Sequence, residues 1–455
     1  MKTNCKIHLS NLVDMTSLKC FKFKEFRGMR FIVFLGLFLI NISTFSQVTD
    51  FIRVDSGHFY KGNVKYKFLG ANYWYGMYLG MESGPGDRDR LIRELDHLQS
   101  LGIKNLRILG SSEGSGKYQI SPPLLISKGK YNEEVFKGLD FLLNELRKRN
   151  MTAVVVLNNF WMWSGGMPQY VSWAEGSDIP LPDIENGDSW DPFINYSASF
   201  YKSNKAQRLY RKNLREIINR INSITGERYK NDPTILSWQL ANEPRGYDYK
   251  KDYRSWIKNT SEFLNRIDKN HMISLGAEGD TGSDQAGVDL YKDNQFEAID
   301  YATIHLWIQN WSWYDPNNPE TFSKALQKAE KYLDSQLKKA KKLNKPVVIE
   351  EFGVSRDNAD FSITSSVHYR NRFYEYVFDY AYQNIIDGGL IQGSNFWSWG
   401  GEGNPSKPGQ MWDRNSDLTG DPPHERQGWY SVYNHDTTTI SIIRESAFKI
   451  NELSR

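Results

Sequence analysis

Short apolar runs alternate with longer segments of helical periodicity along most of the chain. We interpret the apolar runs as strands, at residues 66–71, 103–109, 152–157, 235–242, 272–277, 301–305, 347–351 and 393–397. Most of them are apolar at nearly every position rather than at alternate positions. That pattern is typical of parallel strands that are covered on both faces.

The segments between these runs carry leucine and isoleucine at three- and four-residue spacing, which predicts amphipathic helices. The predicted helices cover residues 88–101, 132–150, 205–229, 253–269, 285–298, 321–343, 367–387 and 440–453, and the pattern is weakest at 285–298. Eight strands, each followed by a helix, predict an α/β protein with a single (β/α)8 TIM barrel. The connections after 158 and after 400 are long and rich in Gly, Pro and aromatic residues, so we expect extended βα loops.

Polar and aromatic side chains follow the predicted strands where each strand ends. They are Asn72, Trp74, Arg107, Asn158, Asn242, Glu243, Glu278, His305, Trp307, Glu351 and Trp397. In a barrel of this kind the chemistry lies at the carboxyl ends of the strands, so these side chains should face one rim. Pro244 cannot donate to a ladder and restricts the residue before it, which places Glu243 where its strand ends. Two glutamates at buried strand ends are what a retaining sugar-cleaving enzyme needs.

Aromatic residues make up 14% of the chain, with 14 Trp and 26 Tyr. They could form a large aromatic core, or they could be platforms on which sugar rings stack. Their positions near the predicted rim single out Trp161, Trp163, Trp307, Trp311 and Trp313 as candidate walls of an extended cleft.

The formal net charge of +3 is concentrated at the N-terminus. Residues 1–46 hold seven Lys/Arg and two Asp/Glu, which leaves about −2 for the remainder. A nearly neutral body gives no electrostatic argument for binding nucleic acid or an anionic membrane. Cys5 and Cys20 both lie in the same N-terminal segment, so the body can form neither a disulfide nor a thiolate metal site. We also find no His/Cys ligand spacing and no P-loop, and we expect no metal and no cofactor.

The N-terminal segment resembles a secretory signal peptide. Arg30 precedes the apolar run 31–42, and Ser43 to Ser46 offer small residues for cleavage. An uncleaved anchor helix is the alternative, but the run is short for a bilayer. We therefore predict a leader over residues 1–46, with Met29 as a possible true start, a secreted protein, no membrane association after cleavage, and one catalytic domain over 47–455.

Four motifs together resemble glycoside hydrolase family 5, and most closely its endo-β-1,4-mannanases. They are the runs Trp238–Arg245 (WQLANEPR), His305–Trp307 (HLW), Ile349–Gly353 (IEEFG) and Asn395–Trp399 (NFWSW), in the family's order. The resemblance implies net retention of configuration and no cofactor. It also implies that Glu243 is the acid/base and Glu351 the nucleophile, with Arg107, Asn242, His305 and Trp397 at family active-site positions.

The same resemblance implies a β-mannan or related polysaccharide as substrate, cut within the chain by double displacement, and we expect a monomer. Trp307 stands where the family usually has Tyr, so the hydroxyl that would contact the nucleophile must come from elsewhere. We expect a raised pKa for Glu243, so that it can act first as an acid. Asn242 should contact the sugar 2-hydroxyl and Trp397 should form the floor beneath the cleaved sugar.

Several alternatives stay open at this stage. Glu350 could be the nucleophile, but successive strand residues point to opposite faces, and the Glu-Phe-Gly match favours Glu351. Glu278 could contact sugar hydroxyls or be a loop charge. The protein could be a cellulase-like β-1,4-glucanase of the same family, because the motifs are shared. It could also be a non-catalytic polysaccharide-binding barrel, although the presence of both glutamates argues against that. A phosphate-handling barrel is disfavoured by the predicted leader.

Overall fold

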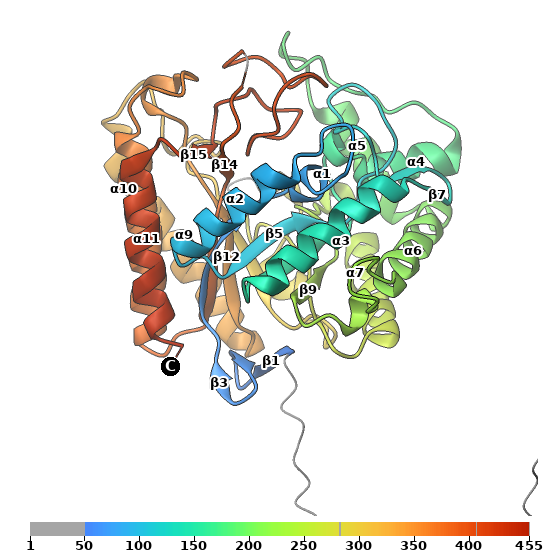
Figure 1. Ribbon diagram of the computed structural model, residues 1–455, viewed down its shortest axis with the longest axis horizontal. Coiled ribbons are helices and arrows are strands. Elements are labelled where there is room, and N and C mark those ends of the chain that lie inside the picture. Colours follow the sequence, from blue (N-terminus) through green and yellow to red (C-terminus); the bar gives the residue numbers. More distant parts are fainter. Residues whose placement is uncertain (1–50, 282–283, 406, 455) are drawn as a thin grey trace, which may run out of the picture. The chain divides into compact units, whose positions relative to one another are not determined.

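Eight parallel strands form the centre of the computed structural model, which describes residues 51–281, 284–405 and 407–454 (Figure 1). In chain order they are β4 (Phe68–Asn72), β5 (Asn105–Leu109), β8 (Thr152–Val156), β9 (Ile235–Gln239), β10 (Met272–Ser274), β11 (Ala302–Leu306), β12 (Val347–Phe352) and β13 (Ile391–Phe396). β13 pairs with β4, and a parallel bridge between Ser274 and Tyr301 joins β10 to β11. The sheet therefore closes, and the predicted (β/α)8 barrel is confirmed.

Helices cover the outer face of this barrel, as the long ones labelled in Figure 1 show. They are α2 (Arg88–Ser100), α3 (Glu133–Lys148), α6 (Asn204–Asn219), α7 (Lys250–Ile267), α8 (Leu290–Asp293), α9 (Thr321–Leu343), α10 (His368–Ile386) and α11 (Thr437–Glu452). Three further helices lie in the connections after β4 and β8: α1 (Gly76–Leu79), α4 (Gly166–Glu175) and α5 (Asp191–Ala198). A short antiparallel hairpin, β6 (Leu125–Ser127) and β7 (Lys130–Tyr131), precedes α3.

A small antiparallel sheet closes the end of the barrel at which the strands begin. It consists of β1 (Ile52–Asp55), β2 (His58–Lys61) and β3 (Val64–Lys65). Ile52 and Phe59 are buried against the early residues of several barrel strands, among them Phe68, Leu236 and Met272. The sequence pattern did not predict this sheet. In Figure 1 it lies at the end opposite β14 (Trp399–Gly401) and β15 (Val432–Tyr433), so the C-terminal rim is left for chemistry.

Two predicted helices are wrong in extent. The predicted helix 205–229 ends as α6 at Asn219, because Arg220 adopts ψ 136° and the Asn222 side chain caps the turn that follows. Ile221 and Ile224, which the pattern placed on the buried stripe, are 52% and 48% exposed. The predicted helix 285–298 reduces to the single turn of α8, whose N-cap is Asp289.

The long connection between β13 and α11 folds over the rim as a fixed structure. Asp421 is buried there and accepts hydrogen bonds from the backbone N–H groups of Gly428 and Tyr430 and from the Ser431 hydroxyl. Trp74, after β4, donates its indole N–H to the Gly420 carbonyl. These bonds position the residues between Asp421 and Gly428 above the strand ends.

The predicted leader lies outside the described residues. Among those that are described, none of the helices combines the length and the apolar character that crossing a bilayer requires.

Candidate active site

Glu243 lies just beyond β9, where the chain leaves the sheet. Its backbone N–H donates to the Gly276 carbonyl, and its φ is 46°, in the left-handed region that a residue with a side chain adopts at a cost of about 1–3 kcal/mol. The hydrogen bond to Gly276 and the following Pro244 hold this backbone conformation in place. The consequence is a carboxylate that is 8% exposed and turned into the rim.

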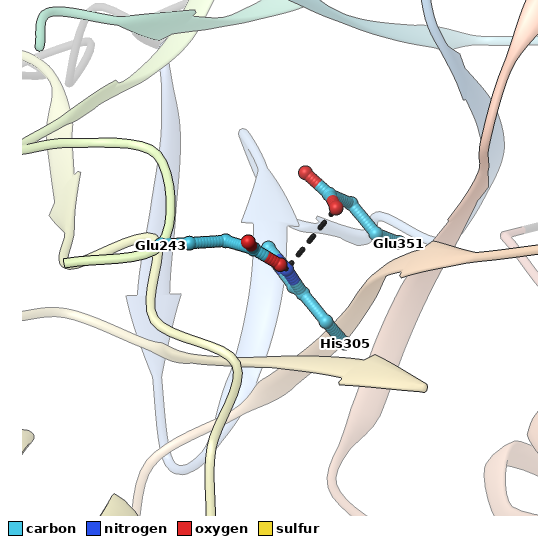
Figure 2. Close-up of side chains that lie close together, drawn as sticks. All are labelled: Glu243, His305 and Glu351. Carbon is cyan, nitrogen blue, oxygen red and sulfur yellow. Dashed lines mark hydrogen bonds and ion pairs between the residues drawn. The ribbon is translucent and has the colours of Figure 1, made fainter. Parts of the chain in front are cut away.

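Glu351 lies on β12 and is 2% exposed. Arg107 of β5 donates to one of its oxygens, and Nδ1 of His305 lies 3.2 Å from the other. Nδ1 of His305 also lies 2.8 Å from Oε1 of Glu243. One oxygen of each carboxylate and the imidazole nitrogen therefore lie within 4.8 Å of one another. Figure 2 shows the two carboxylates converging on the ring of His305.

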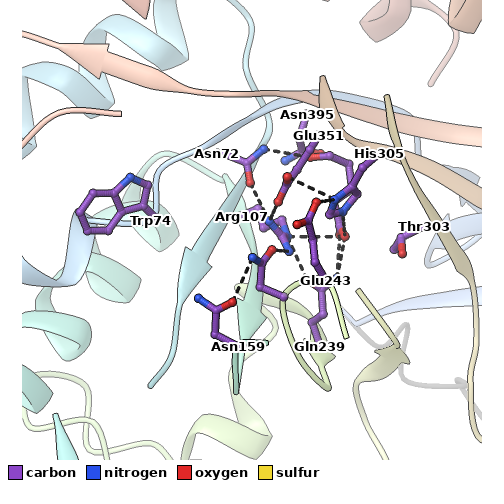
Figure 3. A network of polar contacts seen from close by, with 12 residues as sticks. Asn72, Trp74, Arg107, Asn159, Gln239, Glu243, Thr303, His305, Glu351 and Asn395 are labelled. Carbon is purple, nitrogen blue, oxygen red and sulfur yellow. Dashed lines mark hydrogen bonds and ion pairs between the residues drawn. The ribbon is translucent and has the colours of Figure 1, made fainter. Parts of the chain in front are cut away.

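Arg107 organises the polar groups around Glu351. Its guanidinium donates to the side-chain oxygens of Asn72, Gln239 and Asn242 at 3.1, 2.8 and 2.7 Å, in addition to Glu351. Figure 3 shows Asn72, Gln239 and Glu351 gathered around Arg107. Because the guanidinium is planar and forked, it fixes Glu351 and Asn242 relative to one another. The guanidinium also places a positive charge directly against the Glu351 carboxylate.

Glu350 also points into the barrel, contrary to the prediction that only one of the two adjacent glutamates would. Its carboxylate is fully buried and accepts from Nε2 of Gln239 at 2.9 and 2.8 Å. The reason is a bulge: Ile304 pairs with Ile349, but His305 pairs with Glu351, so Glu350 is the extra residue. Glu351 lines the rim cavity, whereas Glu350 lies outside the set of residues that line it.

The His305 ring is fully buried between carboxylates. Burial lowers its pKa, but the charge of Glu351 and the close polar contacts with Glu243, Glu350 and Glu351 raise it well above the ordinary value. Burial likewise raises the pKa of Glu243, but the hydrogen bond and charge of His305, the charge of Arg245 and the Trp161 N–H lower it to about 2. The raised pKa expected for Glu243 is therefore wrong for this state, because the hydrogen bond and charge of His305 favour the ionised carboxylate.

Glu278, which follows β10, is held by a cation rather than left free. Arg245 donates to its two oxygens at 2.6 and 2.7 Å. Burial raises the pKa of Glu278 to about 7, against the lowering effect of Arg245. The same guanidinium lies 4.9 Å from the ring centre of Trp161, whose indole N–H donates to Oε2 of Glu243 at 2.8 Å. Glu278 thus supports the wall beside the acid/base candidate.

A cavity of about 520 Å³ opens at these strand ends, within the size range of ligand sites. Seven predicted site residues line it: Trp161, Asn242, Glu243, Glu278, Trp307, Glu351 and Trp397. Trp163 and Trp311, two of the candidate cleft walls, line it as well. Indole faces therefore surround the carboxylates, which is the surface that pyranose rings stack on.

Five of the predicted site residues do not line this cavity, among them Asn72, which accepts a hydrogen bond from Arg107. Arg107 and His305 are buried and act on the carboxylates directly. Asn158 accepts from the backbone N–H of Asn159, and Trp74 packs edge-on against Trp163, apart from the network in Figure 3. Trp313, a further candidate wall, packs against Trp311 and Tyr332.

The sequence prediction missed several cavity residues. Arg245, Trp190, His424, Glu425 and Trp429 line it. Arg245 could have been found from its place directly after Asn-Glu-Pro. The other four lie in irregular loops, where no periodicity reports the direction of a side chain.

Trp307 brings no hydroxyl to the nucleophile. In the described part of the chain, Arg107 and His305 are the cations within 4 Å of the Glu351 carboxylate. Trp307 packs instead against Trp397 and Tyr430, and the Tyr430 hydroxyl donates to Asn310.

Glu243, His305 and Glu351 are also spaced as metal ligands could be. Their donor atoms do not fit that role. Arg107 and His305 already place positive charge against Glu351, and Trp161 donates to Glu243. A cation would have to displace an imidazolium proton and compete with a guanidinium, so the arrangement serves acid–base and nucleophilic chemistry instead.

Two facing carboxylates in a tryptophan-lined cavity of a (β/α)8 barrel define a glycoside hydrolase. A family model described as GH family 5 beta-mannosidase-like matches residues 49–455, so the chain belongs to glycoside hydrolase family 5.

Relatives of known name agree with this family. The chain is 28% identical over 390 residues to mannan endo-1,4-beta-mannosidase 4 of Solanum lycopersicum, covering 82% of this chain and 90% of that protein. Its structure is similar to the crystal structure of a glycoside hydrolase family 5 mannosidase from Rhizomucor miehei, with 36% identity, a TM-score of 0.83, and 89% and 99% of the two chains covered. A variant of that mannosidase in complex with mannosyl-fructose gives the same identity and TM-score over 90% and 100% of the chains.

Proposed function

We propose that this protein hydrolyses β-1,4-mannosidic bonds of mannan, glucomannan or galactomannan with net retention of configuration. The observation that carries the proposal is the approach of the Glu243 and Glu351 carboxylates within 4.8 Å. Retaining enzymes place their two carboxyl groups about 5–5.5 Å apart, whereas inverting enzymes need about 6.5–9.5 Å to admit a water. The names of the relatives above support mannan as the substrate.

In the first step Glu351 attacks the anomeric carbon and Glu243 protonates the leaving oxygen. The C–O bond to the leaving sugar breaks and a glycosyl ester on Glu351 forms. In the second step Glu243 takes a proton from water, which attacks the same carbon and releases Glu351. Arg107 orients Glu351 for the attack and stabilises its carboxylate again on departure.

Contacts in the cavity fit a pyranose above Glu351. Trp397 lines it beside Trp307, with ring centres 6.1 Å apart, and forms the floor of the reacting sugar. Asn242 accepts from Arg107 with its side-chain oxygen and donates its amide N–H₂ to Asn159. We assign the same amide as the donor to the 2-hydroxyl of that sugar. The 2-hydroxyl is axial in mannose and equatorial in glucose, so this contact bears on the choice between mannan and glucan.

Cleavage in the middle of a polysaccharide requires a cavity that is open at both ends. The wall that contains His424 and Trp163 affects whether this cavity is open in that way. The His424 ring stacks on Trp163, with ring centres 6.3 Å apart and an interplanar angle of 12°, and so connects the loops after β13 and β8. This contact favours a second candidate mode, removal of sugars from a chain end. A falling viscosity of mannan early in the reaction supports internal cleavage, whereas release of only mannose or mannobiose supports the chain-end mode.

The direct test is a reducing-sugar assay of the purified protein on mannan and, in parallel, on carboxymethyl-cellulose. Glu351→Gln is the control. Turnover of mannan that the control lacks supports the proposal. Preference for cellulose supports a β-1,4-glucanase. Tight binding of mannan without turnover on any glycan would show a polysaccharide-binding barrel.

We also propose that the protein is exported and loses residues 1–46. The charged and apolar segments of the N-terminus support this. N-terminal sequencing of protein from the culture medium should begin at Gln47; retention of the whole protein inside the cell contradicts export.

A further inference from the structure

The two-carboxylate mechanism makes no use of Glu350, although this group lies at the centre of the site. Its side chain is fully buried, and the bulge between β11 and β12 directs it inward beside Glu351. Burying an ionised carboxylate is costly unless a cation or several hydrogen bonds compensate it. The groups around Glu350 therefore indicate what it does.

The hydrogen bonds to Glu350 are few. The amide N–H₂ of Gln239 donates to both carboxylate oxygens of Glu350. Nε of Arg107 lies 3.5 Å away, but its N–H donates to Oε1 of Gln239, and the other guanidinium nitrogens bond Asn72, Asn242 and Glu351. Arg107 consequently compensates Glu350 only in part.

The remaining cation in reach is the His305 imidazolium. Its Nε2 lies 3.8 Å from Oε2 of Glu350, and this buried nitrogen has no hydrogen-bond partner among the described residues. Its other nitrogen, Nδ1, faces Glu243 and Glu351. A protonated His305 ring places positive charge beside Glu243, Glu350 and Glu351. A neutral ring would leave Glu350 beside a polar group that carries no charge.

We propose that Glu350 is a positioning residue that keeps His305 protonated, so that the proton required by Glu243 is stored on Nδ1 of His305. When substrate binds, the Nδ1–H bond breaks and the proton moves 2.8 Å along the existing hydrogen bond to Oε1 of Glu243, which then protonates the leaving oxygen. In the second step Glu243 takes a proton from water and returns it to Nδ1. The inference rests on the proposed function only where the stored proton is passed to the leaving oxygen.

Other charges also face the imidazole, and they fix the sign of the effect. Glu243 approaches from the end of β9, Glu350 and Glu351 from β12, Arg107 from β5 and Glu278 from the end of β10. Replacing Glu350 by glutamine removes one negative charge and keeps the shape. The proton affinity of the His305–Glu243 pair then falls, and the pair loses its proton at lower pH.

The test combines imidazole NMR with pH–rate profiles of Glu350→Gln. With ¹⁵N-labelled histidine, and the His305 signal assigned by its loss in His305→Asn, the wild-type ring should stay protonated from pH 5 to 8. In Glu350→Gln it should titrate within that range, and the alkaline limb of kcat/KM should move down by about one pH unit or more. Activity at low pH should be largely retained.

Two variants separate this role from a structural one. Glu350→Asp keeps the charge and should leave the alkaline limb in place even if it loses activity. Glu113→Gln removes another buried carboxylate, held by Tyr170 and the Gly166 N–H, and should move neither the limb nor the His305 signal. An unchanged His305 titration in Glu350→Gln, or an equal loss of activity at every pH, overturns the proposal. The NMR experiment needs no substrate, so a protein that fails to cleave mannosides would leave its result intact.

Discussion

The hydrogen bond between Trp161 and Glu243 offers the sharpest single perturbation of the site. The indole N–H donates to Oε2 of Glu243 at 2.8 Å, and the bond stabilises the ionised carboxylate. Trp161→Phe removes the donor but keeps an aromatic ring beneath Arg245. A hydrogen bond to a charged group contributes about 1.5–3 kcal/mol, and one pKa unit corresponds to about 1.36 kcal/mol. The pKa of Glu243 should therefore rise by about 1–2 units.

The direction of the change follows from the form that is stabilised. A bond to the charged form lowers a pKa, so its removal raises the pKa and Glu243 keeps its proton to higher pH. The alkaline limb of kcat/KM should stay in place, because Glu243 is ionised on both sides of it and the proton that is lost there is the one we assign to His305. In this respect the variant differs from Glu350→Gln, whose alkaline limb should move down.

The assay is a ¹³C NMR titration of the Glu243 carboxyl carbon in the wild type and both tryptophan variants, with the signal assigned by its loss in Glu243→Gln. Trp163→Phe is the matched control: Trp163 lines the same cavity, but it stacks on His424 instead of bonding Glu243. Both variants can weaken binding, but only Trp161→Phe should raise the pKa of Glu243. If that pKa stays in place, or rises equally in both variants, the reasoning about Glu243 is refuted.

The remaining predictions concern the acid and the barrel packing. Glu243→Ala should lose about 10²–10⁴-fold in kcat/KM on mannan but much less on a dinitrophenyl β-mannoside, whose leaving group needs no proton in the first step; equal losses of kcat/KM on both substrates would contradict its role as the acid. Gly138→Ala should lower the free energy of unfolding in urea by about 1–3 kcal/mol, because a Cβ there would lie 2.1 Å from the Met77 carbonyl oxygen of α1; unchanged stability would mean that the contact between α1 and α3 is loose.

The barrel strands could be predicted because each strand is a local apolar run. The apolar runs that form β9 and β12 also lead into Glu243 and Glu351, so the sequence could single out these two carboxylates as candidates. The pairing of strands is not local, however. Nothing in Val347–Phe352 alone reports the bulge that turns Glu350 inward, since the bulge arises from the register of β11 against β12.

The irregular loops are a second part of the structure that the sequence could not predict. His424 and Glu425 reach the cavity because Asp421 fixes the backbone around them, and that anchoring depends on contacts made only after folding. The protonation of the site was unpredictable for the same reason. The pKa of Glu243 depends on Nδ1 of His305, which is 62 residues away in sequence and 2.8 Å away in space.

The central claim is that Glu351 forms a covalent bond to the sugar. The most direct measurement is mass spectrometry of peptides after incubation with 2-deoxy-2-fluoro-β-mannosyl fluoride, a substrate whose second step is slow. We predict one fluoromannosyl group per chain, attached to the peptide at Glu351 and absent from Glu351→Gln. A label on Glu350 or Glu243, or turnover of this reagent with inversion and without any labelled peptide, would contradict the account.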